Sequence, residues 1–192
     1  SGPGNNPVEP SAPLKNIAGW SASLTTLTGM MSNLSVTAGI NQFYKVQNPA
    51  RSVEYYMIEN RQATGRGSSL PDAGLAIWLV DTTGNNSYQD RTTARHYYCT
   101  LVQADGEWDL ETSLSTGDAT DLWSAPTHVL LTPDTSPAAT WWSGADAPVY
   151  IEQISASAPV MTFSYRSSPG SLAVTVTALP AGLQAPWRLE GP

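Results

Sequence analysis

Basic residues and cysteine are both scarce in this sequence, and each shortage excludes a class of protein. Lys and Arg together number 9 against 16 Asp and Glu, which gives a formal net charge of −7. A surface that follows a nucleic-acid backbone needs clustered cations, yet no window of ten residues holds three basic side chains. We therefore expect no nucleic-acid partner. Cys99 is the single cysteine, so an internal disulfide is excluded.

Long apolar runs and helical periodicity are also missing. The longest stretches without charge are rich in polar residues, so no membrane span is expected. No basic start followed by an apolar run comes after Ser1, so we expect no signal peptide in this chain. Helical periodicity occurs only over Ala12–Ala18, where Pro13 suits the first turn and Gly19 suits the end.

Strand patterns dominate the rest of the sequence. Segments that alternate in polarity, or that are dense in β-branched and aromatic residues, are Ser23–Leu27, Asn33–Ala38, Gln42–Val46, Val53–Glu59, Leu75–Val80, His96–Gln103, Val149–Ile154 and Val160–Tyr165. Leu75–Val80 is almost entirely apolar, as in a strand that is covered on both faces. The sequence predicts a mainly β fold, with antiparallel sheets packed as a sandwich, long loops and one short N-terminal helix.

A change in composition near the end predicts a domain boundary. Ser167–Gly170 has the composition of a linker, and Ser171–Thr177 is an alternating strand. One strand cannot bury itself. We therefore expect a β-rich domain over residues 1–166, and a linker with the truncated start of a following small β module over residues 167–192.

The clearest chemical feature is an acidic segment. Nine Asp and Glu residues and no Lys or Arg lie between His96 and Tyr165, and six of the nine fall between Asp105 and Asp121. Oxygen-rich loops that contain glycine suit Ca²⁺, which takes six to eight hard oxygen ligands. The predicted calcium ligands are Asp105, Asp109, Asp118 and Asp121. The alternative is a solvated acidic face that aids solubility.

Residues for catalysis are few. The two histidines, His96 and His128, are 32 residues apart and form no zinc-binding spacing. No G-x-S-x-G elbow is present. Cys99 lies in an apolar segment, where a buried and inert thiol is expected. Glu59 and Arg61 are expected to form a structural ion pair.

Aromatic residues offer a second kind of site. Trp141 and Trp142, together with Trp108 and Trp123, could form a platform that stacks on sugars. Packing in the core or between the sheets is the alternative that we favour.

Several segments appear in an order that resembles a known family. They are SAPLKNIAGW, EYYMIENRQ (54–62), LPDAGLAIWLVD (70–81), LVQADGEWDL (101–110), GDATDLW (117–123), YIEQIS and MTFSY. Together, over roughly residues 1–165, they resemble the region of immune inhibitor A-like secreted metallopeptidases that follows the catalytic HExxH motif. One departure is Leu79, because family members commonly have histidine in the corresponding Ile-Trp-His-(Val/Ile)-Asp motif.

The resemblance implies that this chain is the accessory part of a larger protein. The zinc ligands and the general-base Glu of the family precede this region, so zinc belongs to the parent protein and no catalytic residue is carried over. The resemblance implies a bacterial, secreted parent that acts as a zinc metalloendopeptidase and also binds structural calcium. Residues 170–192 resemble instead the first strands of small β modules appended to secreted bacterial proteins.

These observations lead to one functional expectation and one alternative. The first is a non-catalytic accessory domain, inert by itself, whose partner is the upstream catalytic domain of the same polypeptide and which supports the peptidase fold and substrate binding. The alternative is a β module that binds a glycan, peptide or protein ligand through its Trp-rich loops.

Overall fold

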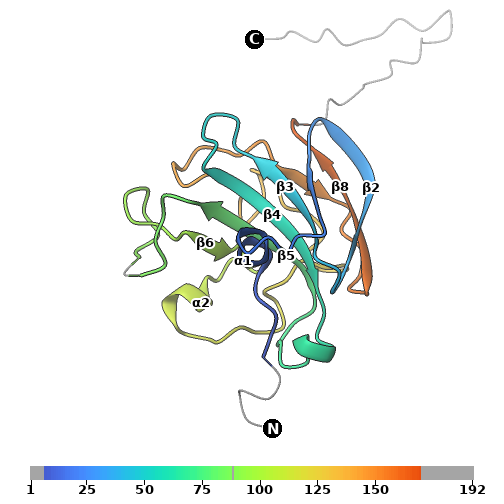
Figure 1. Cartoon of the computed structure of the whole chain (residues 1–192). Coiled ribbons are helices and arrows are strands. Elements are labelled where there is room, and N and C mark those ends of the chain that lie inside the picture. Colours follow the sequence, from blue (N-terminus) through green and yellow to red (C-terminus); the bar gives the residue numbers. More distant parts are fainter. Residues whose placement is uncertain (1–6, 88, 170–192) are drawn as a thin grey trace, which may run out of the picture.

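The chain folds into two β-sheets that pack face to face, with one short helix on the outside of the larger sheet (Figure 1). This is a computed structural model, and it describes residues 7–87 and 89–169. In chain order the elements are α1 (Ala12–Ile17), β1 (Ser23–Thr26), β2 (Met30–Thr37), β3 (Gln42–Gln47), β4 (Glu54–Arg61), the 3-10 turn η1 (Gly65–Gly67), β5 (Gly74–Asp81), β6 (Cys99–Leu101), α2 (Asp109–Thr112), β7 (Tyr150–Glu152) and β8 (Val160–Arg166). The expected mainly β sandwich is confirmed.

The strand order places one parallel pair in sheets that are otherwise antiparallel, as expected. The larger sheet has the order β1-β3-β4-β5-β6 and the smaller sheet has the order β2-β8-β7. All pairs are antiparallel except β1 with β3, which are parallel. Strand β2 lies in the other sheet, so the chain leaves the larger sheet after β1 and re-enters it in the same direction.

Strands β4 and β5 form the centre of the molecule and are buried on both faces. Alternate residues such as Tyr56, Ile58 and Ile77 point into the main core between the two sheets. The residues between them, such as Met57 and Val80, belong to a second core on the other face. The apolar composition of Leu75–Val80 predicted burial of this strand on both faces, and that prediction is confirmed.

Loops complete the layer that covers the main core. The smaller sheet has only three strands, and Trp123, Leu131, Trp141 and Val149, which lie outside any strand, are buried in the same core. Isolated bridges such as Leu131 with Ile151 tie this segment to the sheet. This long irregular segment thus covers part of the main core in place of additional strands.

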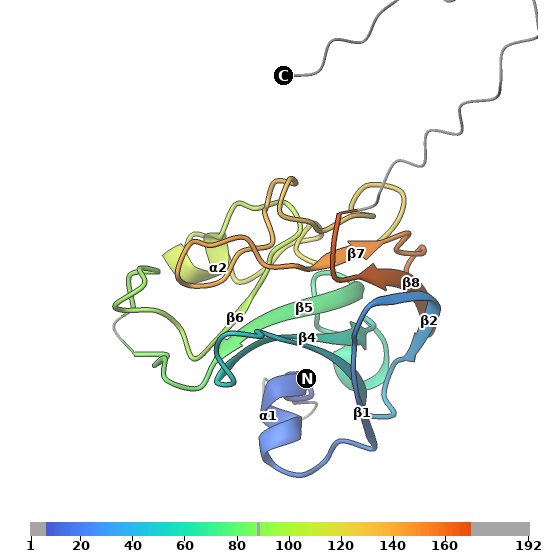
Figure 2. The same cartoon turned by 90° about the horizontal axis from the view of Figure 1, so that it is seen from above.

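Helix α1 covers the outer face of the larger sheet. Figure 2 shows α1 on one side of β4 and β5, with β7 and β8 on the other side. Ala12 is fully buried against the sheet, and its N–H donates to Oε1 of Glu59 on β4 at 3.0 Å. Pro13 lies in the first turn, as predicted. The helix is therefore fixed to β4 at its N-terminal end.

Two further expectations concern the C-terminal segment and the absence of a membrane span. The strand expected at Ser171–Thr177 and most of the second predicted unit lie outside the described residues. Among residues that the structure describes, no helix has the length and apolar character needed to cross a membrane.

Candidate metal centre

Two loops bring three of the four predicted calcium ligands together. Asp105 lies in the turn after β6, and Asp118 and Asp121 lie in the loop that follows α2. Thr120 joins the loops, because its hydroxyl lies 2.7 Å from Oδ2 of Asp105 and 2.6 Å from Oδ1 of Asp118. The N–H of Ala104 also donates to the carbonyl of Asp121 at 2.9 Å.

Glycine permits the backbone turn that this arrangement needs. Gly117, just before Asp118, has φ of +104°, which side-chain-bearing residues rarely adopt. A Cβ at this position would also lie 3.1 Å from Oδ2 of Asp121. The residue before the acidic turn therefore has both a conformational and a steric reason to be glycine.

The geometry of the cluster suits a cation. Asp105, Asp118 and Asp121 each offer one carboxylate oxygen, and these three oxygens lie within 4.8 Å of one another. Asp121 is only 3% exposed. Its Oδ2 accepts the N–H of Asp118 at 2.8 Å, whereas its Oδ1 is buried and accepts no hydrogen bond. Oδ1 of Asp109 is buried and unpartnered in the same way. Buried polar atoms in proteins normally have partners, so Oδ1 of Asp121 is free to bind a cation.

The electrostatics of these carboxylates also suit a cation. Burial, together with the charges of Asp118, Asp109 and Asp105, raises the pKa of Asp121 from its ordinary value of 3.8 to about 6, against the opposing hydrogen bond from the N–H of Asp118. Asp118 differs, because the Thr120 hydroxyl and N–H hold the pKa of its carboxyl below the ordinary value. A divalent cation would relieve the repulsion and let Asp121 ionise. Hard oxygen donors in flexible loops match the ligands of Ca²⁺.

Asp109 lies outside this set. It begins α2 and is 7% exposed, and its N–H donates to Oε1 of Gln103 at 3.1 Å. Its carboxylate is not among the three converging oxygens, although its charge still acts on Asp121. The prediction of four ligands is therefore reduced to three that converge.

The cluster gives the fold a measurable pH dependence. Because the pKa of Asp121 is raised in the folded state, the unfolded chain gives up this proton more readily between about 3.8 and about 6. Without a cation, the contribution of Asp121 to the free energy of unfolding therefore falls as the pH rises through this window. We expect chemical denaturation of the calcium-free protein to show this loss, and the variant Asp121→Asn to lack it. Equal pH slopes for both proteins in this window would contradict the assignment.

The tryptophans of the alternative site are placed mainly in the interior. Trp141 is 6% exposed and belongs to the main core, where its ring lies 5.2 Å from that of Tyr56. Trp142 is half-buried and stacks on His96, with 5.0 Å between ring centroids. Neither ring forms part of an open flat platform, which argues against the sugar-binding alternative.

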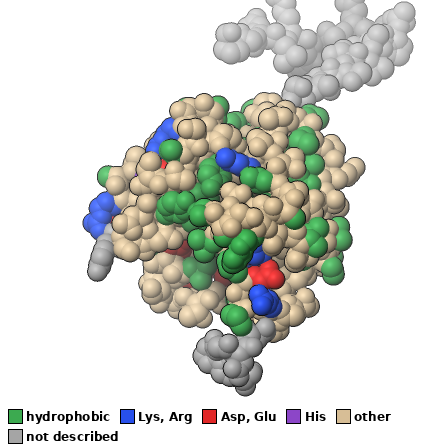
Figure 3. All heavy atoms as spheres, viewed as in Figure 1, with side chains coloured by type: hydrophobic (Ala, Val, Ile, Leu, Met, Phe, Trp, Pro, Cys, Tyr) green, Lys and Arg blue, Asp and Glu red, His purple; other side chains and the backbone are tan. Residues whose placement is uncertain are grey.

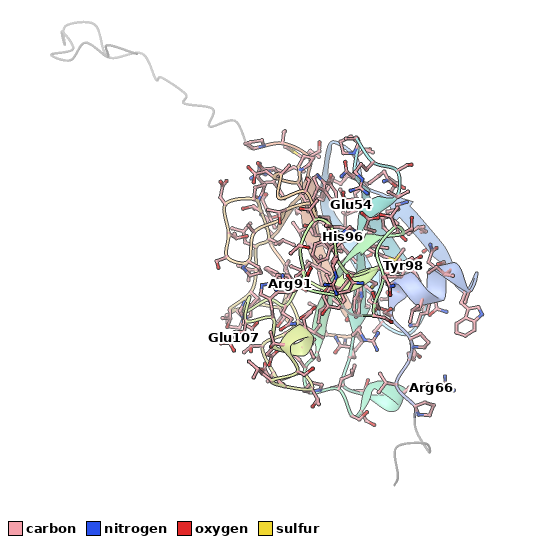
Figure 4. The ribbon with its side chains drawn as sticks, turned by 90° about the vertical axis from the view of Figure 1, so that its left-hand side faces the viewer. Glu54, Arg66, Arg91, His96, Tyr98 and Glu107 are labelled. Carbon is pink, nitrogen blue, oxygen red and sulfur yellow. The ribbon has the colours of Figure 1, made fainter. Side chains whose placement is uncertain are left out.

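His96 belongs to a buried polar cluster at the ends of β4 and β5. Its Nε2 lies 3.2 Å from Oδ2 of Asp81, and Arg51 lies 3.0 Å from the same oxygen. Glu54 accepts the N–H of Trp142 at 2.7 Å. Figure 4 shows Glu54 and His96 on this side of the molecule, away from Glu107. These charges are paired with one another, so the cluster joins the 82–98 loop and the 140–142 loop to the larger sheet.

The position of Cys99 is also explained by packing. Burial raises the pKa of the Cys99 thiol to about 12, so the reactive thiolate is suppressed. The strand expected at His96–Gln103 is shorter than predicted and covers only Cys99–Leu101. His96 therefore lies in the preceding loop and faces Asp81 instead. Glu59 and Arg61 form the expected ion pair, at 3.1 Å.

The sequence did not predict that a further acidic residue, Asp72, lies near the site. Oδ2 of Asp72 accepts the N–H of Leu122 at 2.7 Å, across 50 residues of sequence. Burial raises its pKa, and the charge of Asp118 raises it further. Only the fold brings the segment around Asp72 beside the acidic loop.

Comparison with known proteins returned no match: no family model, curated protein or solved structure is similar enough to this chain to be linked to it. The function must therefore be argued from the site itself.

Proposed function

We propose that this chain is a non-catalytic β-sandwich domain that binds one calcium ion and accompanies the catalytic domain of a secreted zinc metallopeptidase. The calcium ion is held by Asp105, Asp118 and Asp121. The domain's role is to support the peptidase fold and the binding of its substrate, while hydrolysis of the peptide bond belongs to the zinc-bearing partner.

The observation that carries the calcium part is the unpartnered Oδ1 of Asp121. This carboxylate is 3% exposed, and it faces a set of acidic oxygens within 4.8 Å. A solvated acidic face, the alternative considered from the sequence, would expose its carboxylates to water. Burial of Asp121 favours a cation site over that alternative.

Calcium would act here by closing the loops on the sheet. The 113–122 loop contacts the larger sheet at Trp123, whose backbone exchanges hydrogen bonds of 2.9 and 3.0 Å with Leu75 on β5. Asp105 lies in the turn that follows β6 in the same sheet. A cation that binds Asp105 and Asp121 therefore joins the turn after β6 to the loop that pairs with β5, and its stabilisation of the fold grows with the logarithm of the calcium concentration above Kd.

The accessory part of the proposal is supported by the ordered motifs shared with immune inhibitor A-like peptidases and by the state of the reactive side chains. The Cys99 thiol is half-buried and its pKa is raised, and His96 and Glu59 are held in structural pairs. The rings of His128 and Trp123 pack in a T-shaped pair with 6.2 Å between their centroids. These four side chains are therefore engaged in packing or in ion pairs.

Reconstitution tests the accessory role. The chain is produced alone and beside a separately expressed upstream segment that carries an HExxH motif, both in calcium-containing buffer. We expect no proteolysis of a casein substrate by the chain alone, and zinc-chelator-sensitive proteolysis when the two are combined. Proteolysis by the purified chain alone, lost on zinc chelation, would contradict the proposal, as would full activity of the upstream segment without this chain.

A further inference from the structure

An apolar groove runs along the outer face of the larger sheet, beside α1. It has a volume of about 330 Å³, at the lower end of the range for ligand pockets, roughly 300–1,000 Å³. In Figure 3, hydrophobic side chains gather around α1 on this face and the surface is hollowed beside them. The groove is separate from the core between the sheets, and neither the calcium site nor the accessory role explains it.

The floor of the groove is fixed and apolar. Leu101 and Leu122 pack with the half-buried Trp78 and Leu110 in a small cluster of their own, and all four line the groove. The indole N–H of Trp78 donates to Oε1 of Glu59 at 3.0 Å, which holds the ring in place. A rigid aromatic and aliphatic floor of this kind suits a large apolar side chain.

The wall formed by α1 is exposed and apolar as well. Leu14 lines the groove and is 54% exposed, and Ile17 and Trp20 further along are each 58% exposed. Large apolar side chains clustered at a groove indicate an interaction surface, whereas single exposed ones carry no such meaning.

The other end of the groove is acidic. Asp72 and Asp121 line it, and Asp118 lies directly behind them. Within residues 7–87 and 89–169, no Lys or Arg forms an ion pair with any of these three carboxylates. Together with Asp105 they make four carboxylates, so a single bound divalent cation leaves excess negative charge.

The one basic side chain in the groove is already engaged. Arg61 donates to Glu59 at 3.1 Å and to the backbone carbonyls of Glu9 and Pro10 at 2.8 and 3.3 Å. An acidic ligand would therefore meet no available cation, whereas a basic ligand would meet the half-buried carboxylate of Asp72 beside the acidic cluster.

We propose that this groove binds an extended peptide segment of a partner protein, with a large apolar side chain on the floor and an adjacent Lys or Arg at Asp72, beside the acidic cluster. The apolar side chain supplies the affinity by burial. The basic side chain supplies the orientation and the preference over acidic sequences. The proposal does not depend on the peptidase partner and goes beyond the proposed function.

Titration with capped tetrapeptides, followed by amide and indole NMR of the full chain in calcium-containing buffer, tests this inference. The Gly-Phe-Arg-Gly peptide is expected to shift the Trp78 indole resonance and the amides of Leu101 and Leu122. Exchange of Phe for Ala, or of Arg for Glu, in the peptide is expected to weaken binding at least tenfold. Calcium binding is measured separately by calorimetry, so failure of the groove and failure of the metal site are distinguished.

Two leucines provide matched variants. Leu14→Glu alters the wall of the groove and is expected to weaken binding of Gly-Phe-Arg-Gly at least tenfold. Leu114→Glu is the control, because Leu114 is 84% exposed and lies outside the groove. It is expected to leave the binding of Gly-Phe-Arg-Gly unchanged. Because both side chains are exposed, both variants should fold.

Three results would overturn the proposal. One is the absence of shifts at Trp78, Leu101 and Leu122, and another is equal binding of the Arg and Glu peptides. The third is a shift of the same resonances with protein concentration alone, which would make a second copy of this chain the occupant.

Discussion

Asp121→Asn is expected to give two effects of opposite sign on the stability of the protein. It removes the central ligand, so calcium affinity should fall by about 100-fold or more, since loss of an outer-shell partner alone costs roughly 10–100-fold. At the same time the calcium-free protein should become more stable. The amide oxygen can still accept the N–H of Asp118, while the new NH₂ group can donate to the oxygens of Asp105 and Asp118.

The measurement is a pair of experiments on each protein: calorimetric titration with Ca²⁺ after chelation, and thermal unfolding with and without Ca²⁺. Asp134→Asn is the matched control, because Asp134 is exposed and lies outside the cluster. It should bind calcium as the unaltered chain does. A calcium response in Asp121→Asn equal to that of Asp134→Asn would show that the ion, if bound, lies elsewhere.

Glu59→Ala is expected to be the most destabilising single substitution on the surface between α1 and the sheet. Oε1 of Glu59 accepts from Ala12, Trp78 and Arg61 at 3.0 to 3.1 Å, and Lys15, itself 6% exposed, lies 3.9 Å from Oε2. Removal of the carboxylate leaves the N–H of Ala12 and the indole N–H of Trp78 without their acceptor, and it takes a buried counter-charge from Arg61 and Lys15, which together costs about 3–5 kcal/mol. Urea denaturation of the calcium-free protein measures this loss.

Glu152→Ala provides the comparison for Glu59→Ala. Glu152 pairs with Arg166 at 2.7 Å, but at the surface, with 30% of its side chain exposed. An exposed pair contributes about 0–1 kcal/mol. If the two substitutions cost the same free energy of unfolding, Glu59 is not the residue that fixes α1 to the sheet.

The strands could be predicted from the sequence because their signals are local. Polarity alternates in Val160–Tyr165, and Leu75–Val80 is apolar throughout, and both segments form strands close to the expected bounds. Pro13 likewise marks the start of α1. These features depend on the residues within each segment, so the sequence carries them directly.

The parts that could not be predicted depend on contacts between distant segments. The parallel pairing of β1 with β3 follows from the placement of β2 in the other sheet. The burial of Leu131 and Val149 in the main core follows from irregular segments that take the place of strands, whereas core packing of Trp141 was expected. Neither fact is encoded in the periodicity of any one segment.

The candidate site, too, could be predicted only in part. Composition indicated an acidic loop, and three of its four aspartates do converge. Asp109, which begins α2, is not among them. Asp72 reaches the site across 50 residues of sequence. The apolar groove, whose lining comes from α1, β5, β6 and α2, had no signal at all.

The central claim is that Asp105, Asp118 and Asp121 hold a calcium ion. A crystal grown with calcium and examined by anomalous scattering tests this claim most directly. The account predicts one anomalous peak coordinated by an oxygen from each of the three aspartates, including Oδ1 of Asp121, at about 2.3–2.6 Å. A cluster without such a peak, with the Asp121 carboxyl protonated and hydrogen-bonded directly to Asp105 or Asp118, would contradict it.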